Sequence, residues 1–205
     1  MITPSFQLKP AQFNMALALN LPTYLTLLRI ALIPLLTIVF YLPWENANVA
    51  CTLIFLLAGF TDWLDGYLAR KMKLETQFGA FLDPVADKLM VAVVLVLLVQ
   101  QINSPYLAIP AAIIIGREIT IASLREWMAE IGQRAHVKVS SLGKWKTSAQ
   151  MLAIGFFLYH DDLFGLPVLE LGYGLLYIAA ILTLWSMIQY LHAAFTAINT
   201  HENVH

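Results

Sequence analysis

Charged residues are scarce in this sequence of 205 residues. Asp, Glu, Lys and Arg make up only 12% of it, hydrophobic residues make up 60%, and the mean hydropathy is +0.72. A soluble globular domain has about 25% charged residues and about 45–50% apolar residues. The composition therefore excludes an ordinary soluble domain and indicates a membrane protein.

The sequence also has little cysteine and no excess of positive charge. The single cysteine, Cys51, excludes an intrachain disulfide and any zinc or iron–sulfur site built from several cysteines. The formal net charge of −1, with no basic tail, argues against nucleic acid as a partner. No basic segment precedes a short apolar core at the N-terminus, so we expect no cleaved signal peptide.

Six apolar segments can be read as membrane spans, each of which needs about 20 helical residues. We therefore predict an all-α, polytopic membrane protein with six transmembrane helices, forming a single domain over residues 1–205. A short interfacial helix is expected before the first span, at residues 11–19. The predicted spans cover residues 22–42, 47–70, 84–101, 105–127, 146–159 and 169–198.

Positive charge is confined to one side of this topology. All twelve Lys and Arg residues fall on the same side, whereas the opposite loops, around Glu45, around Asn103 and at residues 161–170, contain none. Basic residues favour the cytoplasmic side of a membrane, so both termini are predicted to face the cytoplasm.

Four aspartates flank the connection between the second and third predicted spans. Asp62 and Asp65 are three residues apart, and Asp83 and Asp87 are four apart, so each pair lies on one face of its helix. Both helix ends lie on the cytoplasmic side, which brings the four carboxylates together near the membrane surface. Because like charges repel, a cation must join them, and oxygen ligands without His or Cys favour Mg²⁺, Mn²⁺ or Ca²⁺.

Glycines and an arginine accompany the aspartates. Gly66 and Gly79 allow close approach of a helix or a ligand, and Arg70 places a bidentate donor where a phosphate could lie. This combination favours a pair of metal ions that bind a pyrophosphate. The alternative is a solvated loop that needs no such spacing, with its aspartates neutralised by neighbouring cations: Arg70, Lys71, Lys73 and Lys88.

The aspartates belong to a longer pattern, Asp62-x2-Asp65-Gly66-x2-Ala69-Arg70-x8-Gly79-x3-Asp83-x3-Asp87. It resembles the complete signature of the CDP-alcohol phosphatidyltransferase family. The resemblance implies a six-helix membrane enzyme, usually a homodimer, with two divalent metal ions, Mg²⁺ or Mn²⁺, in a cavity that faces the cytoplasm. Such enzymes displace CMP from a CDP-linked lipid or alcohol by direct attack of a hydroxyl group.

The same resemblance implies roles for individual residues. The metal ligands would be Asp62, Asp65, Asp83 and Asp87. Of these, Asp83 and Asp87 would be the catalytic pair, with Asp87 either a ligand or the base for the incoming hydroxyl. The nucleotide site would comprise Thr26, Arg29, Asp62, Gly66, Ala69, Arg70 and Gly79.

Residues 116–147 form a basic segment, with six basic and three acidic residues and a net charge of +3. A positive segment beside the metal site suits an acceptor that carries a phosphate. Arg117 lies well inside the fourth predicted span and needs an anionic partner there, which would be Asp65, Glu118 or a substrate group.

Further motifs in residues 20–29 and 116–147 are similar to those of the bacterial branch of the family. That branch uses CDP-diacylglycerol as donor and sn-glycerol-3-phosphate as acceptor, in the cytoplasmic (inner) membrane. The implied acceptor-phosphate site consists of Arg117, Arg125, Lys138, Lys144 and Lys146.

Two alternatives stay open. Within the same family, the acceptor could be inositol phosphate or phosphatidylglycerol. More remotely, intramembrane carboxylates occur in cation channels and transporters, which predicts polar residues distributed across the bilayer. In this sequence the carboxylates gather near one membrane face instead.

Overall fold

The computed structural model describes residues 20–72, 76–130, 141–163 and 165–202, and these ranges form six α-helices without a β-strand. The all-α prediction is therefore confirmed. In chain order the helices are α1 (Leu21–Phe40), α2 (Ala47–Met72), α3 (Gln77–Ile102), α4 (Pro105–Glu130), α5 (Ser141–Tyr159) and α6 (Val168–Glu202).

Four of these helices are long and apolar enough to cross a membrane. The candidate spans are Leu21–Phe40, Ala47–Leu68, Pro105–Glu130 and Val168–Thr196. They confirm a multi-pass membrane protein. The helices α3 and α5 cover the third and fifth predicted spans but are not among these four. The expected interfacial helix at residues 11–19 lies outside the described residues.

The third helix begins at Gln77 rather than at residue 84, where the sequence analysis placed the start of the third span. Thr76 caps the helix, since its side chain accepts a hydrogen bond of 3.0 Å from the backbone N–H of Gly79. Pro84 is accommodated inside the helix. As a result, Asp83 and Asp87 lie within α3 instead of at its tip. Likewise, α5 starts at Ser141, ahead of the predicted span.

Gly79 lies where the start of α3 approaches the start of α1. A Cβ atom at this position would lie 2.9 Å from Oγ1 of Thr76 and 3.1 Å from Oγ1 of Thr23. The two threonine hydroxyls are themselves 3.3 Å apart, and Thr23 also donates to the side chain of Asn20, at 2.8 Å. The absent side chain thus allows the two helix starts to share one network of hydroxyl groups.

We expect Gly79→Ala to lower the melting temperature of the detergent-solubilised protein. The added methyl group would displace Thr76 from its capping position, and losing such a cap costs about 0.5–2 kcal/mol. Gly155→Ala is the matched control, because among the described residues no atom beyond its chain neighbours and its own helix backbone lies within 4 Å of the Cβ position of Gly155. It should leave the melting temperature unchanged or raise it. Equal melting temperatures for the two variants would contradict the role given to Gly79.

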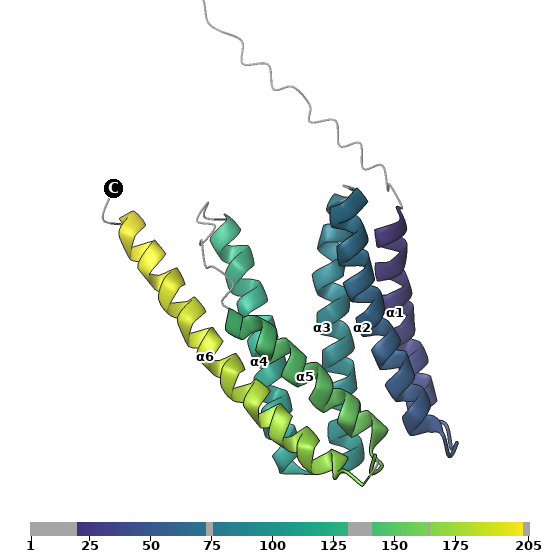
Figure 1. Cartoon of the computed structure of the whole chain (residues 1–205). Helices are drawn as coiled ribbons and strands as arrows, with labels where there is room; N and C mark the ends of the chain where they lie inside the picture. Colours follow the sequence, from purple (N-terminus) through teal and green to yellow (C-terminus); the bar gives the residue numbers. More distant parts are fainter. Residues whose placement is uncertain (1–19, 73–75, 131–140, 164, 203–205) are drawn as a thin grey trace, which may run out of the picture.

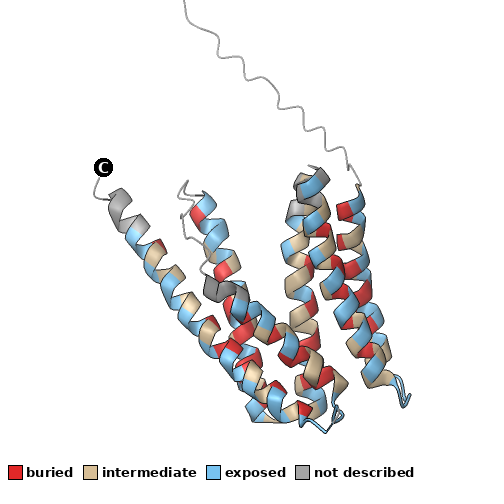
Figure 2. Ribbon diagram, in the orientation of Figure 1, coloured by how far each residue is buried: buried red, intermediate tan, exposed pale blue. Residues whose placement is uncertain are grey.

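The helices form two groups that meet at one end of the molecule and separate toward the other (Figure 1). In one group, α1 packs against α2 and α3; in the other, α4 and α5 pack against α6. The helix α5 also contacts α2 and α3, and so joins the groups. Buried residues line the sides on which the helices face one another, while exposed residues cover the outer sides (Figure 2).

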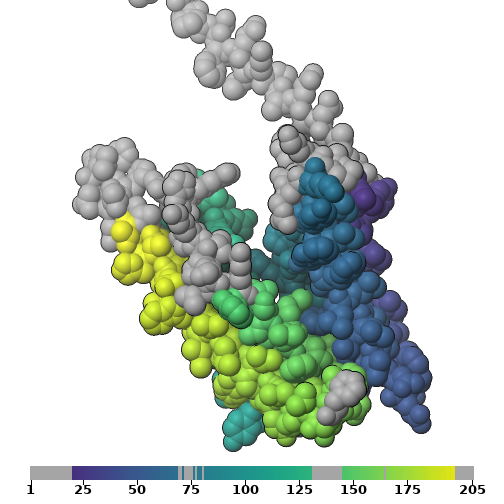
Figure 3. Space-filling model, viewed as in Figure 1, coloured from purple at the N-terminus to yellow at the C-terminus, as the bar shows by residue number. Residues whose placement is uncertain are grey.

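The end at which the groups separate is called the open end below. It contains the first turns of α1 and α3 and the last turns of α2, α4 and α6 (Figure 1). The space-filling view shows a gap here between α4 and the side formed by α2 and α3 (Figure 3). The outer faces of the helices carry exposed large hydrophobic side chains, such as Leu53, Trp63 and Trp185, which suits a surface surrounded by lipid.

Candidate active site

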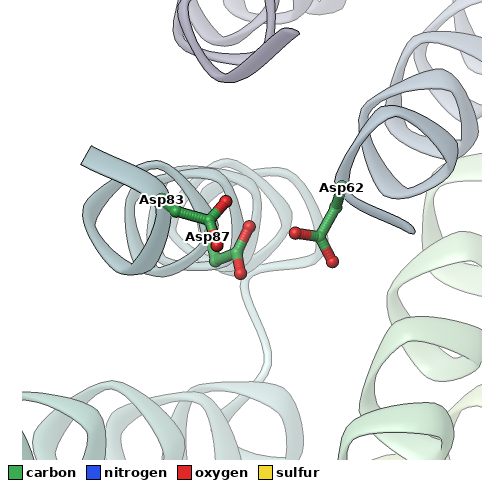
Figure 4. Close-up of side chains that lie close together, drawn as sticks. All are labelled: Asp62, Asp83 and Asp87. Carbon is green, nitrogen blue, oxygen red and sulfur yellow. The ribbon is translucent and has the colours of Figure 1, made fainter. Parts of the chain in front are cut away.

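Three aspartates from two helices converge toward the open end. Asp62 comes from α2, and Asp83 and Asp87 come from successive turns of α3. Each offers a carboxylate oxygen, and these oxygens all lie within 4.8 Å of one another. Figure 4 shows the three side chains directed toward one another across the space between the helices. The structure thus brings together three of the four aspartates predicted as metal ligands, and we call them the aspartate trio.

Asp65 lies apart from the trio. Its side chain is only 4% exposed, and its Oδ2 atom accepts hydrogen bonds from Arg29, at 2.6 Å, and from Thr26, at 3.4 Å. Both donors come from α1. The helical spacing correctly places Asp65 one turn from Asp62, but Asp65 is buried against α1 and is not part of the trio.

The guanidinium group of Arg29 lies among all four carboxylates. Its Nη1 atom is 3.0 Å from Asp62 and 3.2 Å from Asp83, and it also donates to Asp87. Its Nη2 atom pairs with Asp65. The residue is 1% exposed. Together, one guanidinium and four carboxylates carry a net charge of −3 when all are ionised.

The sequence predicts Arg29 near the nucleotide and offers other cations as counter-ions of the aspartates. Among the described side chains, however, Arg29 makes the ion pairs with the aspartates. Lys71 instead lies over the ring of Tyr67, 5.5 Å from its centroid. The signal was present in the sequence: Arg29 is the only charged residue between Lys9 and Glu45, and an arginine within an apolar span requires an anionic partner.

The donor atoms of the trio fit a hard divalent cation. All are carboxylate oxygens, the ligands that Mg²⁺, Mn²⁺ and Ca²⁺ prefer, and their spacing lets a single ion be shared. Nitrogen and sulfur ligands, which zinc and copper favour, are not part of the group. The trio is therefore a candidate site for a divalent metal ion.

The other residues predicted for the nucleotide site surround the aspartates as far as the structure describes them. Thr26 is buried beside Asp65 and also donates to the backbone carbonyl of Pro22, at 3.2 Å. Gly66 follows Asp65 on α2, and Gly79 lies one turn before Asp83 on α3. The side chains of Ala69 and Arg70 lie outside the described part of the structure.

A second charged cluster joins α4 to α5. One oxygen of Glu118, Oε1, accepts hydrogen bonds from Nη1 of Arg117 and from Nζ of Lys146, both at 2.9 Å. Arg117 is 9% exposed and Lys146 is 5% exposed. Of the two protein partners considered for Arg117, the structure thus selects Glu118 and not Asp65.

The helix α6 holds the arginines of α4 from the other side. Arg117 donates to the hydroxyl of Ser186, at 2.8 Å, and Arg125 donates to the hydroxyl of Tyr190, at 3.1 Å. Both guanidinium groups also lie near the Tyr190 ring, 5.8 Å and 5.2 Å from its centroid. No role was predicted for α6 from the sequence. The available signal was a polar pair, Ser186 and Tyr190, four residues apart in an apolar helix.

We call Arg117, Arg125, Lys146 and Glu118 the basic cluster. Three cations and one carboxylate give it a net charge of +2. It contains three of the five residues predicted for the acceptor phosphate. Of the other two, Lys138 lies outside the described residues, and so does the side chain of Lys144.

Comparison with known proteins assigns the chain to a family. The CDP-alcohol phosphatidyltransferase family matches residues 19–185. A protein of Haemophilus influenzae is 56% identical over 176 residues, covering 85% of this chain and 93% of the relative. One of Sodalis glossinidius is 55% identical over 177 residues, covering 86% and 95%. Both are named CDP-diacylglycerol–glycerol-3-phosphate 3-phosphatidyltransferase. With its signature aspartates gathered between α2 and α3, this chain belongs to the CDP-alcohol phosphatidyltransferase family.

Proposed function

We propose that the protein transfers the phosphatidyl group of CDP-diacylglycerol to sn-glycerol-3-phosphate, a step of phospholipid biosynthesis. A hydroxyl of the acceptor attacks the phosphorus that carries the diacylglycerol, and the bond from this phosphorus to CMP breaks. The products are phosphatidylglycerophosphate, the precursor of phosphatidylglycerol, and CMP.

The observation that carries the proposal is the aspartate trio, because its oxygens can share one divalent ion within the family's own signature. The names of the relatives support the choice of substrates.

The four aspartates would hold two ions of Mg²⁺ or Mn²⁺. When bound, such a pair supplies positive charge to both the attacking and the leaving oxygens of a direct displacement. Asp83 and Asp87 lie on the face of α3 that is turned toward Asp62, where the reacting phosphate would be held. Asp87 is either a ligand alone or also the acceptor of the hydroxyl proton. The residues themselves thus position the substrates and balance charge, as is usual in phosphoryl transfer.

The two substrates would bind to different parts of the protein. For the CDP group we propose Thr26, Arg29, Asp62, Gly66, Ala69, Arg70 and Gly79. For the phosphate of the acceptor we propose the basic cluster, because two of its three cations, Arg117 and Lys146, are buried and the cations exceed its single carboxylate. Lys138 and Lys144 would complete this second site.

We further propose six transmembrane spans in a single domain, with both termini and the active site facing the cytoplasm from the inner membrane of a bacterium. The described Lys and Arg residues support this orientation, because each belongs to the middle of its helix or to the turns nearer the open end. The opposite end carries Glu45, Asp161 and Asp162. Membrane lipids would surround the helices, and a homodimer is the expected assembly.

A panel of acceptors tests the choice of substrate. The purified protein receives CDP-diacylglycerol and Mg²⁺ with sn-glycerol-3-phosphate, glycerol, inositol phosphate, serine or phosphatidylglycerol, and the lipid products are identified. We expect a product with sn-glycerol-3-phosphate only. A product with inositol phosphate or phosphatidylglycerol instead would keep the family chemistry but reject the proposed acceptor.

We expect Tyr190→Leu to raise the KM for sn-glycerol-3-phosphate about tenfold, because two cation–π contacts and one hydrogen bond that hold the arginines would be lost. The KM for CDP-diacylglycerol should change little, and Tyr190→Phe should show a smaller effect because it keeps the ring. Tyr177→Leu, at an exposed position of the same helix, is the matched control. Equal acceptor KM values for Tyr190→Leu and this control would remove Tyr190 from the acceptor site.

A further inference from the structure

The Nη1 atom of Arg29 contacts the same three carboxylates that could hold a metal ion. It lies 3.0 Å from an oxygen of Asp62 and 3.2 Å from one of Asp83, and it also donates to Asp87. A single guanidinium nitrogen carries only two hydrogens. The hydrogen bonds of Nη1 go to Asp83 and Asp87, and its contact with Asp62 is an ion pair.

A guanidinium nitrogen and a divalent ion cannot occupy this place together. Carboxylate oxygens approach Mg²⁺ or Ca²⁺ to about 2.0–2.6 Å, so an ion shared by the trio would lie between the same three carboxylates that Nη1 contacts. The two cations would also repel each other strongly at such a distance. Either Arg29 or the ion can be bound by the trio, but not both.

Arg29 has a second anchor outside the trio. Its Nη2 atom is paired with Asp65 at 2.6 Å, and Asp65 is buried next to Thr26. In addition, its Nε–H group is buried and has no hydrogen-bond partner among the residues that the structure describes. An arginine that loses the trio therefore keeps an anionic partner, which a buried guanidinium requires.

We infer that Arg29 is an internal cation that competes with a divalent metal ion for Asp62, Asp83 and Asp87, and that it withdraws onto Oδ2 of Asp65 when the ion binds, so that the other oxygen of Asp65 can still serve the second ion of the proposed pair. This inference rests on the metal-dependent site of the proposed function. It gives Arg29 two effects: it stabilises the packing of α1 against α2 and α3 when no metal is bound, and it weakens the binding of the metal.

The test is the equilibrium binding of Mn²⁺ to the purified full-length protein, followed by the electron paramagnetic resonance signal of free Mn²⁺. For Arg29→Gln we expect a Kd for the tightest site that is lower than that of the unaltered protein by about tenfold or more, because a competing charge is removed. In EDTA the melting temperature of this variant should fall, and saturating Mn²⁺ should raise it by more than it does in the unaltered protein.

Lys71→Gln is the matched control. Like Arg29→Gln, it removes one positive charge, here from the last turn of α2. Lys71, however, is exposed and lies over the ring of Tyr67 instead of among the aspartates. Its Kd for Mn²⁺ should equal that of the unaltered protein. A Kd for Arg29→Gln that is unchanged or higher would overturn the inference, and so would an equal decrease in Lys71→Gln.

Arg29→Lys keeps the test decisive if Arg29→Gln fails to fold. A lysine has one charged nitrogen and cannot hold Asp65 and the trio together, so Mn²⁺ should bind more tightly than in the unaltered protein. Equal or weaker binding of Mn²⁺ would overturn the inference.

The outcome of this test is separable from the proposed function. Tighter Mn²⁺ binding by the Arg29 variants, with no CMP release by the unaltered protein, would reject the transfer reaction and leave the inference standing.

Discussion

Asp83→Asn should abolish turnover while leaving the protein folded. We expect kcat to fall by roughly a thousandfold or more, because a metal ion contributes several kcal/mol to transition-state stabilisation and each 1.4 kcal/mol corresponds to about a factor of ten. Asparagine has the same shape but lacks the charge. The loss of stability should be small, since the Asp83 side chain is 43% exposed. Its ion pair with Arg29, at 3.2 Å, is also the longest of the four ion pairs that Arg29 makes with the aspartates.

Asp161→Asn is the control for this change, because Asp161 is exposed in the connection between α5 and α6, at the opposite end of the molecule. Its kcat should be unchanged. The measurements are CMP release under saturating substrates and the melting temperature of each variant. Activity of Asp83→Asn within tenfold of the unaltered protein would contradict the assignment of Asp83 as a metal ligand.

Arg117→Ala should raise the KM for sn-glycerol-3-phosphate about a hundredfold, because a buried arginine that pairs with a phosphate contributes a strong charge-assisted interaction. The KM for CDP-diacylglycerol should change far less, since the nucleotide is expected at the aspartates. The pattern of KM values distinguishes substrate binding from a general structural defect. Arg117→Lys should recover part of the acceptor affinity because it restores the charge.

The same variants also test a purely structural role for Arg117. It already bonds to Glu118 and Ser186, so its loss leaves the partly buried carboxylate of Glu118 with Lys146 alone. If this were its whole function, Arg117→Ala would lower the melting temperature and leave the acceptor KM unchanged. That result would remove Arg117 from the acceptor site and leave the aspartate chemistry untouched.

The helices were predictable because each is an apolar segment bounded by turn residues. Their ends were less predictable. The third span was predicted to start at Pro84, because the apolar run there follows directly after the charged residue Asp83. The true start depends on Thr76, whose hydroxyl caps the helix, and on Gly79, which lets α1 approach. Such contacts between helices are not visible in the local sequence.

The aspartates show the same division between local and tertiary information. Their three- and four-residue spacing predicts which carboxylates share a helix face, and the structure brings Asp62 together with Asp83 and Asp87. The position of Arg29 depends on how α1 packs against α2 and α3, and no spacing within one helix reports it. The contacts of Ser186 and Tyr190 with the arginines of α4 were missed for the same reason.

The most direct measurement is the release of CMP from CDP-diacylglycerol by the purified protein, together with the formation of phosphatidylglycerophosphate. We predict that both products appear in a ratio of one to one, and only when sn-glycerol-3-phosphate and Mg²⁺ or Mn²⁺ are present. EDTA should stop both. Protein that is shown to be folded but releases no CMP with any acceptor, or that releases it equally well in EDTA, would contradict metal-dependent phosphatidyl transfer at the aspartates.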